Sequence, residues 1–494
     1  MPTLTIDGKA LEFTPGETVI RVAHRNGIEI PFYCWHPGLS VAANCRICLV
    51  DVEKQPKLQP ACQWPCTDGM VVHTQNEKSI AARKAVQEFL LLNHPVDCPI
   101  CDQAGECKLQ DYWMAHDKQA SRLFDEREKV HKPKAVSLGP NVVLDAERCI
   151  LCTRCVRFCD EVAKDHVLEV RHRGDHGEIF AATGRQLDHD YSLMTVQICP
   201  VGALTSKDFR FKERVWFLEA TETVCPGCAT GCNAFLDVGR GTTAHRMRAR
   251  ENLEVNRYWM CDDGCLTYKR IEEERLSKAA TGRGAARKAT SLAAGISAAA
   301  ESLRSVPKAA LGVVLSAQHT VEENAALARL AASLGAGRVY LSGREDWKAD
   351  DLLRHRDQNP NRAGAIAAAG ASPPASFQEL LSDVKSGRTQ ALLVLGQDAP
   401  IDDLADLDGL DALVVLAPND GPFVLHAKVL LPVASFGEVA GTYVNAKGMA
   451  QRTTPALRPR GDSLPADEMI ARLSRALGLD APATVSGQQQ AAAQ

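Results

Sequence analysis

The sequence predicts a multidomain α/β protein with a small β-rich domain, a cysteine-rich middle region and a doubly wound α/β domain. Three observations predict this architecture. Alternating apolar and polar residues open the chain, all 18 cysteines lie between Cys34 and Cys265, and strand patterns alternate with helix patterns after them. A chain of 494 residues is long enough for about three domains.

Amino-acid composition excludes several classes of function before any motif is considered. The net charge is -4, with 57 basic and 61 acidic residues, so no basic surface field for nucleic acid is expected. Residues 1–13 lack the layout of a secretion signal, and no apolar run approaches the ~20 residues of a spanning helix. We therefore expect a cytoplasmic chain. Clustered cysteines in a reducing compartment indicate metal sites rather than disulfides, with structural zinc as the simplest alternative.

The first predicted domain covers residues 1–78. "TLTIDGKALEF" reads as two strands around a turn, and "TPGETVIRVAHRNG" carries helix signals from the N-cap Thr14 to the stop at Gly27. The cysteines that follow are similar in order to those of a plant-type (β-grasp) ferredoxin, whose 2Fe-2S cluster takes two close and two distant cysteines. The first spacing is ten residues, where plant-type ferredoxins have four. We predict as ligands Cys34, Cys45, Cys48 and Cys62, with Cys66 surplus.

The second predicted domain, residues 79–118, contains "HPVDCPICDQAGEC". Before it, Ile80, Val86, Phe89 and Leu90 form an approximately helical apolar stripe that Pro95 ends. A lone histidine at a helix end is usually a capping or solvent-exposed group. Three thiolates, however, leave a 4Fe-4S cluster one ligand short, and a histidine is the nearest group that completes the set. The predicted ligands are His94, Cys98, Cys101 and Cys107.

The third predicted domain covers residues 119–220. "ERCILCTRCVRFCDEVA" contains Cys149, Cys152 and Cys155, and "ICPVGAL" adds a remote cysteine, Cys199, followed by proline. Because no second triplet lies beside this remote cysteine, the pattern indicates one 4Fe-4S cluster held by these four residues. Cys159 is interpreted as a small packing residue.

A fourth set lies in residues 221–275, in "CPGCATGC" and "MCDDGC". The spacing fits a zinc ribbon of Cys225, Cys228, Cys261 and Cys265, which leaves Cys232 without a ligand role. It fits equally a 4Fe-4S cluster of Cys225, Cys228, Cys232 and Cys261, which strands Cys265.

These motifs occur in the order seen in the large iron-sulfur subunit (the G subunit) of bacterial NADH:quinone oxidoreductase, respiratory complex I, which residues 1 to about 270 resemble closely. The resemblance implies that His94 is a cluster ligand and that the fourth set is a 4Fe-4S site. It implies one 2Fe-2S and three 4Fe-4S clusters, and a flavin-bearing NADH-oxidising subunit among the partner subunits. It also implies a place in a peripheral arm on the cytoplasmic side of the inner membrane, with membrane association only through the complex.

Residues 276–483 alternate strand and helix, as in a doubly wound α/β domain. Apolar strands are predicted at "ALGVVLS", "RVYLSG", "ALLVLGQD" and "ALVVLAPND", and Thr320 is predicted to cap a helix. The segment from "VLLPVASF" to "ALRP" resembles the closing segment of molybdopterin oxidoreductases, although the domain is shortened and has no cysteine for molybdenum. We expect a docking domain without molybdenum, followed by a disordered tail at 484–494.

The function expected from these features is electron transfer within an oxidoreductase, without a catalytic site in this chain. No dinucleotide-binding fingerprint for NADH is present. One alternative is the iron-sulfur subunit of a soluble NAD-linked formate dehydrogenase or hydrogenase, which shares the first three motifs. Another is a zinc-stabilised scaffold without a redox role.

Overall fold

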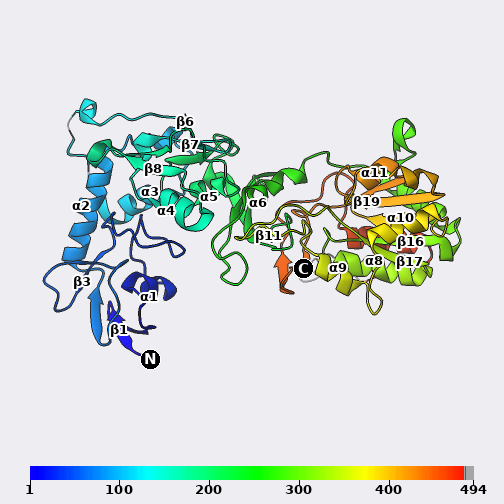
Figure 1. The fold of residues 1–494 in the computed structure, drawn as a ribbon, viewed down its shortest axis with the longest axis horizontal. Coiled ribbons are helices and arrows are strands. Elements are labelled where there is room, and N and C mark those ends of the chain that lie inside the picture. The colour runs from blue at the N-terminus through cyan, green and yellow to red at the C-terminus, as the bar shows by residue number, and fades with distance from the viewer. Residues whose placement is uncertain (119, 124, 483, 485–494) are drawn as a thin grey trace. The chain divides into compact units, whose positions relative to one another are not determined.

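The computed structural model describes residues 1–118, 120–123, 125–482 and 484, which fold as two units (Figure 1). Unit 1 is Met1–Phe217 and unit 2 is Leu218–Gln494. The predicted disordered tail lies outside the described residues except for position 484. Among the described residues, no helix is long and apolar enough to cross a bilayer.

Unit 1 begins with a five-stranded sheet in which β1 pairs with β2 in antiparallel and with β5 in parallel orientation. Asp7 and Gly8 form the predicted turn, with φ angles of 46° and 82°. In sheet order the strands are β2 (Lys9–Glu12), β1 (Thr3–Ile6), β5 (Met70–His73), β3 (Leu49–Val52) and β4 (Gln59–Pro60). The two predicted strands are therefore present, paired with each other in this sheet.

Helix α1 (Val19–Arg25) starts later than the sequence predicts. Residues 14–17 form a turn instead, in which the Glu17 carboxylate accepts a 2.7 Å hydrogen bond from the Thr14 amide. The amide of Val19 donates to Trp64 O at 3.0 Å rather than to a preceding helical carbonyl. The predicted N-cap at Thr14 is thus wrong, because backbone contacts with a distant segment decide where the helix begins.

Helix α2 (Glu77–Asn93) forms where predicted, but its apolar stripe is not its buried face. The side chain of Phe89 is 73% exposed, whereas Arg83 and Gln87 are buried. Arg83 donates to Thr74 O at 2.6 Å, and Gln87 bonds Leu109 O at 2.8 Å and the Tyr33 hydroxyl at 2.6 Å. Polar contacts therefore orient this helix, which period counting does not predict.

The rest of unit 1 consists of short elements around the cysteine loops. A three-stranded antiparallel sheet has the order β10-β7-β6, and β8 pairs with β9 as a hairpin. The elements are α3 (Lys108–Tyr112), β6 (Val136–Ser137), β7 (Val142–Leu144), α4 (Arg154–Phe158), β8 (Leu168–Arg171), β9 (Glu178–Ala181), α5 (Ser192–Gln197) and β10 (Leu204–Ser206).

Unit 2 opens with an antiparallel sheet of β11 (Leu218–Val224), β12 (Asn233–Gly239) and β13 (Thr243–Ala249), followed by α6 (Asp262–Leu266). A seven-stranded sheet follows, in the order β15-β14-β20-β19-β18-β16-β17. Its strands are β14 (Ala280–Thr281), β15 (Lys288–Ala289), β16 (Leu311–Ser316), β17 (Arg338–Ser342), β18 (Ala391–Leu395), β19 (Ala412–Ala417) and β20 (Val429–Pro432). The strands from β16 to β20 are parallel, which confirms the predicted α/β fold.

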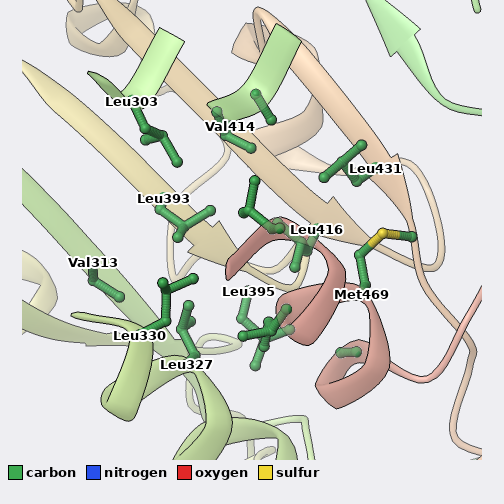
Figure 2. Close-up of a cluster of buried hydrophobic side chains, with 14 of the residues drawn as sticks. Leu303, Val313, Leu327, Leu330, Leu393, Leu395, Val414, Leu416, Leu431 and Met469 are labelled. Carbon is green, nitrogen blue, oxygen red and sulfur yellow. The ribbon is translucent and has the colours of Figure 1, made fainter. Parts of the chain in front are cut away.

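Helices cover both faces of this sheet because successive strand residues point to opposite sides. Figure 2 shows the core on one face, where Leu393 and Leu395 of β18 pack with Leu327 of α8 and Met469 of α12. On the other face Leu392 packs with side chains of α10 and α11. The helices are α7 (Leu292–Arg304), α8 (Val321–Leu334), α9 (Arg362–Ala368), α10 (Phe377–Lys385), α11 (Pro422–His426) and α12 (Ala466–Ala476). A final hairpin joins β21 (Gly441–Val444) and β22 (Ala450–Thr453).

The predicted cap of α8 is confirmed. The Thr320 hydroxyl and the Glu323 carboxylate form a capping box, each bonding the backbone amide of the other.

Candidate metal centres

The first cysteine set joins three residues of the loop between α1 and β3 to Cys62, which follows β4. The amide of Cys34 donates to Cys45 Sγ at 3.5 Å, and hydrogen bonds from the Cys45 and Cys62 thiols lower the pKa of Cys34. A hydrogen bond with the Cys62 thiol likewise lowers the pKa of Cys48. All four predicted ligands are thus direct neighbours. Ala43 adopts a left-handed φ of 51° and helps to turn the loop at Cys45.

Cys66 lies apart from this set. Its amide donates to Glu17 O at 2.9 Å, and its side chain packs in the core beneath the sheet. Burial raises the pKa of the Cys66 thiol to about 11, with a further contribution from Glu17. Its surroundings are those of a packing residue.

His94 lies where α2 ends and the second cysteine loop begins, and it is only 9% exposed. Burial lowers the pKa of its ring to about 4, so the imidazole is neutral at pH 7, the form that binds metals. The amide of Val96 donates to His94 Nδ1 at 3.0 Å. If iron bound Nδ1, it would use the lone pair that accepts this hydrogen bond. If iron bound Nε2, the neutral ring would carry its proton on Nδ1, which could then no longer accept. Iron binding would therefore break this contact.

The three cysteines after His94 are neighbours of one another. Burial raises the pKa of the Cys107 thiol to about 11, and the Cys101 and Cys98 thiols raise it further. The Cys101 sulfur lies against Gly202 from a distant loop, because a Cβ built on Gly202 would be 2.2 Å from Sγ. Arg214 binds the same loop by donating to Cys101 O at 2.8 Å.

The third set lines a small cavity. Its lining includes all four predicted ligands, and the remaining walls are mostly apolar; the lining residues include Cys149, Cys152, Cys155, Cys199, Leu144, Ile150, Ile179, Val201 and Leu204. Burial raises the thiol pKa of Cys149 to about 12 and that of Cys152 to about 11. Such thiols ionise at pH 7 only beside a cation such as iron, so the donor set fits a bound cluster.

Cys159, the fifth cysteine of this region, does not line the cavity. It is fully buried, and its Sγ lies 3.5 Å from His189 Nε2. Burial raises the pKa of its thiol to about 12, with Asp165 as the next cause.

The fourth set lies in unit 2, between β11, β12 and the start of α6. Burial raises the pKa of the Cys232 thiol strongly, and the other four thiols of this region, Cys225, Cys228, Cys261 and Cys265, raise it further. Backbone amides supply hydrogen bonds to sulfur, from Gly227 to Cys225 at 3.4 Å and from Gly264 to Cys261 at 3.3 Å. All five thiols of the region are therefore neighbours.

No group of three or more His, Cys, Asp or Glu side chains in the described part of the chain has the geometry for holding one metal ion. Iron-sulfur clusters place different demands on their ligands, since the cysteines bind separate iron atoms bridged by sulfide.

Two of the candidate sites in unit 1 are joined by hydrogen bonds. Asn44 of the first loop donates to Leu151 O of the third loop at 3.1 Å. Arg157 donates to Cys34 O at 2.6 Å and to Cys152 O at 3.2 Å. Arg154 donates to Trp35 O at 2.5 Å. Cysteine spacing alone does not identify these arginines, although Arg154 stands between two predicted ligands in "CTRC".

Iron-sulfur family models match the segments that carry the first three candidate sites. Residues 1–77 match a 2Fe-2S iron-sulfur cluster binding domain, and residues 83–122 match the NADH-ubiquinone oxidoreductase-G iron-sulfur binding region. Residues 139–205 match the ferredoxin-like domain of NADH-quinone oxidoreductase subunit 3, and residues 266–476 match molybdopterin oxidoreductase. The protein is therefore an iron-sulfur protein with ferredoxin-like domains and a molybdopterin-oxidoreductase-like C-terminal domain.

Individual similar proteins carry more specific names. A Rickettsia conorii protein, named as the G subunit of NADH-quinone oxidoreductase, is 35% identical over 72% of this chain and 52% of its own length. A Streptomyces coelicolor protein of the same name is 43% identical over 55% of this chain and 32% of its own length. A solved chain of an NAD+-reducing [NiFe]-hydrogenase is 32% identical, covers 43% of this chain and 91% of its own, and has a TM-score of 0.39.

Over the matched residues the chain is similar to NADH-quinone oxidoreductase G subunits. It spans about half the length of the Rickettsia conorii relative and about a third of the Streptomyces coelicolor relative.

Proposed function

We propose that this chain is the iron-sulfur electron-transfer subunit of an NADH:quinone oxidoreductase. It receives single electrons that originate as hydride on NADH, which a flavin-bearing partner subunit oxidises, and it passes them toward a quinone site. Similarity to proteins named as G subunits favours this function over that of a formate dehydrogenase or hydrogenase subunit. The redox chemistry belongs to the clusters, and the chain binds them, excludes water and sets their electrostatic surroundings.

The observation that carries the proposal is the direct contact between two candidate cluster loops. Arg157 bonds the carbonyls of one predicted ligand from each loop, Cys34 and Cys152. A protein that only stores metal has no need for neighbouring sites, whereas electron transfer between clusters requires them to be close. The buried thiols supply the ligands, and the apolar walls at the third site exclude water.

The proposed ligands form four groups, with one 2Fe-2S cluster in the first and a 4Fe-4S cluster in each of the others. They are Cys34, Cys45, Cys48 and Cys62; His94, Cys98, Cys101 and Cys107; Cys149, Cys152, Cys155 and Cys199; and Cys225, Cys228, Cys232 and Cys261. We assign the α/β domain of unit 2 a docking role within the complex. The complex itself would place this chain in a peripheral arm on the cytoplasmic side of the membrane.

Metal analysis with EPR spectroscopy tests this proposal. Full-length protein reconstituted anaerobically should hold about fourteen irons per chain, counted as one 2Fe-2S and three 4Fe-4S clusters, and should be brown. About ten irons would remove the fourth cluster from the proposal. Zinc bound in stoichiometric amount would support the zinc ribbon at Cys225, Cys228, Cys261 and Cys265 instead.

A further inference from the structure

Arg154 is a buried cation between two candidate cluster sites. It is the first residue of α4, it is only 6% exposed, and its side chain helps to line the cavity at the third site. From there it reaches the first site, where Nη2 donates to the carbonyl of Trp35, the residue after Cys34. Its Nη1 donates at 3.0 Å to the carbonyl of Ile198, the residue before Cys199. One guanidinium therefore binds the backbone beside a predicted ligand of each cluster.

The charge of Arg154 has no carboxylate counter-ion in the described part of the chain. Its hydrogen bonds go to two neutral carbonyls, the Phe32 ring lies 5.6 Å from its Cζ, and its buried Nε has no partner. An unpaired buried charge is costly, so an anion is expected close by. The acidic groups that interact most strongly with its charge are thiols: Cys152 and Cys199, which line the same cavity, and Cys34 and Cys45 of the first set.

We propose that Arg154 is a shared counter-charge that raises the reduction potentials of both the 2Fe-2S cluster and the Cys149–Cys199 4Fe-4S cluster. This inference rests on the proposed function. A cluster held by four thiolates is anionic and becomes more negative when it is reduced, so a fixed cation beside it favours the reduced state. Because the guanidinium stays protonated at all accessible pH values, the effect is permanent. The charge of Arg154 thus acts on two clusters at once.

Arg148 provides an internal comparison. It is also a buried arginine of unit 1, but both of its contacts at 2.8 and 2.6 Å are to the carboxylate of Asp97. The thiol that interacts most strongly with its charge is Cys101 of the second set. Its charge is therefore already paired; it directly precedes Cys149 of the third set, but its hydrogen bonds in the described part of the chain do not reach the first set.

The test is an EPR-monitored redox titration of the reconstituted full-length chain and its variants. Arg154→Gln and Arg154→Met remove the charge; the methionine variant suits the apolar surroundings if glutamine impairs folding. In both variants, the ratio of reduced to oxidised centre at a fixed ambient potential should fall about tenfold for both clusters, equivalent to about 59 mV for a one-electron couple. Arg154→Lys keeps the charge and should leave both potentials close to those of the wild type. Arg148→Met should leave the 2Fe-2S potential unchanged.

Each other outcome has a defined meaning. Unshifted potentials in both neutral variants, a shift in only one cluster, or a shift in Arg154→Lys as large as in Arg154→Gln would overturn the proposal. An equal shift of the 2Fe-2S potential in Arg148→Met would also overturn it. Loss of iron from both neutral variants but not from Arg154→Lys would support it, whereas loss from all three would overturn it. Wild-type protein without these EPR signals would instead refute the proposed function.

Discussion

Gly202 lies directly against the sulfur of Cys101, so closely that a Cβ on Gly202 would be 2.2 Å from Sγ. The two residues belong to different predicted domains, since Cys101 is in the His94 loop and Gly202 follows Cys199 and Pro200. The amide of Lys108 reinforces the contact by donating to Pro200 O at 3.0 Å. The loop that carries the remote ligand of one candidate cluster therefore also shapes the site of the next.

Gly202→Ala should disturb the His94 cluster selectively. The added methyl group has no space beside Sγ, so Cys101 must move away from its iron. We expect loss or strong change of one EPR signal and up to four irons lost, with the 2Fe-2S signal retained. Gly409→Ala is the matched control, because nothing lies within 4 Å of its added Cβ. Wild-type iron content and spectra in Gly202→Ala would contradict the observed packing.

His94→Cys should keep its 4Fe-4S cluster but lower its potential, because a thiolate adds a negative charge where the imidazole is neutral. The protein should remain folded, since cysteine supplies the missing coordination. A redox titration followed by EPR measures the shift. An unchanged spectrum and potential would show that His94 only terminates α2.

The three surplus cysteines should be dispensable for iron. Serine at Cys66, Cys159 or Cys265 should leave iron content intact, with Cys159→Ser the most destabilising because that side chain is fully buried. Iron content and thermal unfolding are the measurements. Loss of about four irons from Cys159→Ser or Cys265→Ser would mean that the remote ligand of that cluster is assigned wrongly.

The fourth site should be structural rather than part of the electron path. Its loop is anchored to the α/β domain, where the Ala229 amide donates to Asp357 O at 2.9 Å and Thr230 bonds Leu353 O. A cluster there would also link Cys232 to Cys261 and so constrain the segment between them. Structural metal sites stabilise a fold in this way. Cys225→Ser should remove one EPR signal and lower thermal stability or assembly. Turnover from NADH to quinone per assembled complex should stay nearly normal; a fall by orders of magnitude with the other clusters reducible would place this cluster on the path.

Glu323 should make unit 2 sensitive to acid. Burial raises the pKa of this carboxyl, but the charge of His319 and the hydrogen bonds from His319 and Thr320 outweigh it, so the net shift is downward from 4.5. A lowered pKa means that Glu323 stabilises the fold above pH 4.5 and that this stability is lost as pH falls through the folded-state pKa.

Glu323→Gln tests this dependence. The two carboxylate oxygens of Glu323 accept hydrogen bonds from the amides of Thr320 at 3.0 Å and Ala466 at 3.2 Å. Glutamine replaces one of these oxygens by an NH₂ group, which cannot accept. The free energy of unfolding should therefore fall by about 2 kcal/mol at pH 7. Denaturant unfolding at several pH values should show that the cost shrinks below pH 4.5. Glu379→Gln is the matched control, because Glu379 holds the same capping-box position in α10 but is exposed, and its effect should be smaller. Equal effects at the two sites would contradict the role of burial.

Local sequence patterns predicted much of this molecule correctly. The Asp7-Gly8 hairpin, the strands from β16 to β19 and the helix cap at Thr320 all depend on neighbouring residues, and the structure confirms them. Cysteine spacing likewise predicted groups of thiols that the structure brings together at the first and third sites. Such features are determined over a few residues, by backbone geometry and side-chain period.

Tertiary structure decided the rest. The start of α1 depends on Trp64 O, and the buried face of α2 depends on Arg83 and Gln87 finding carbonyl and hydroxyl partners far along the chain. The position of Arg154 between two sites and the contact of Gly202 with Cys101 are likewise invisible in the sequence. The physical reason is that each of these features joins segments distant in sequence. The sequence by itself determined which residues are candidates to hold metal, and only the packing decided which charges and backbones surround them.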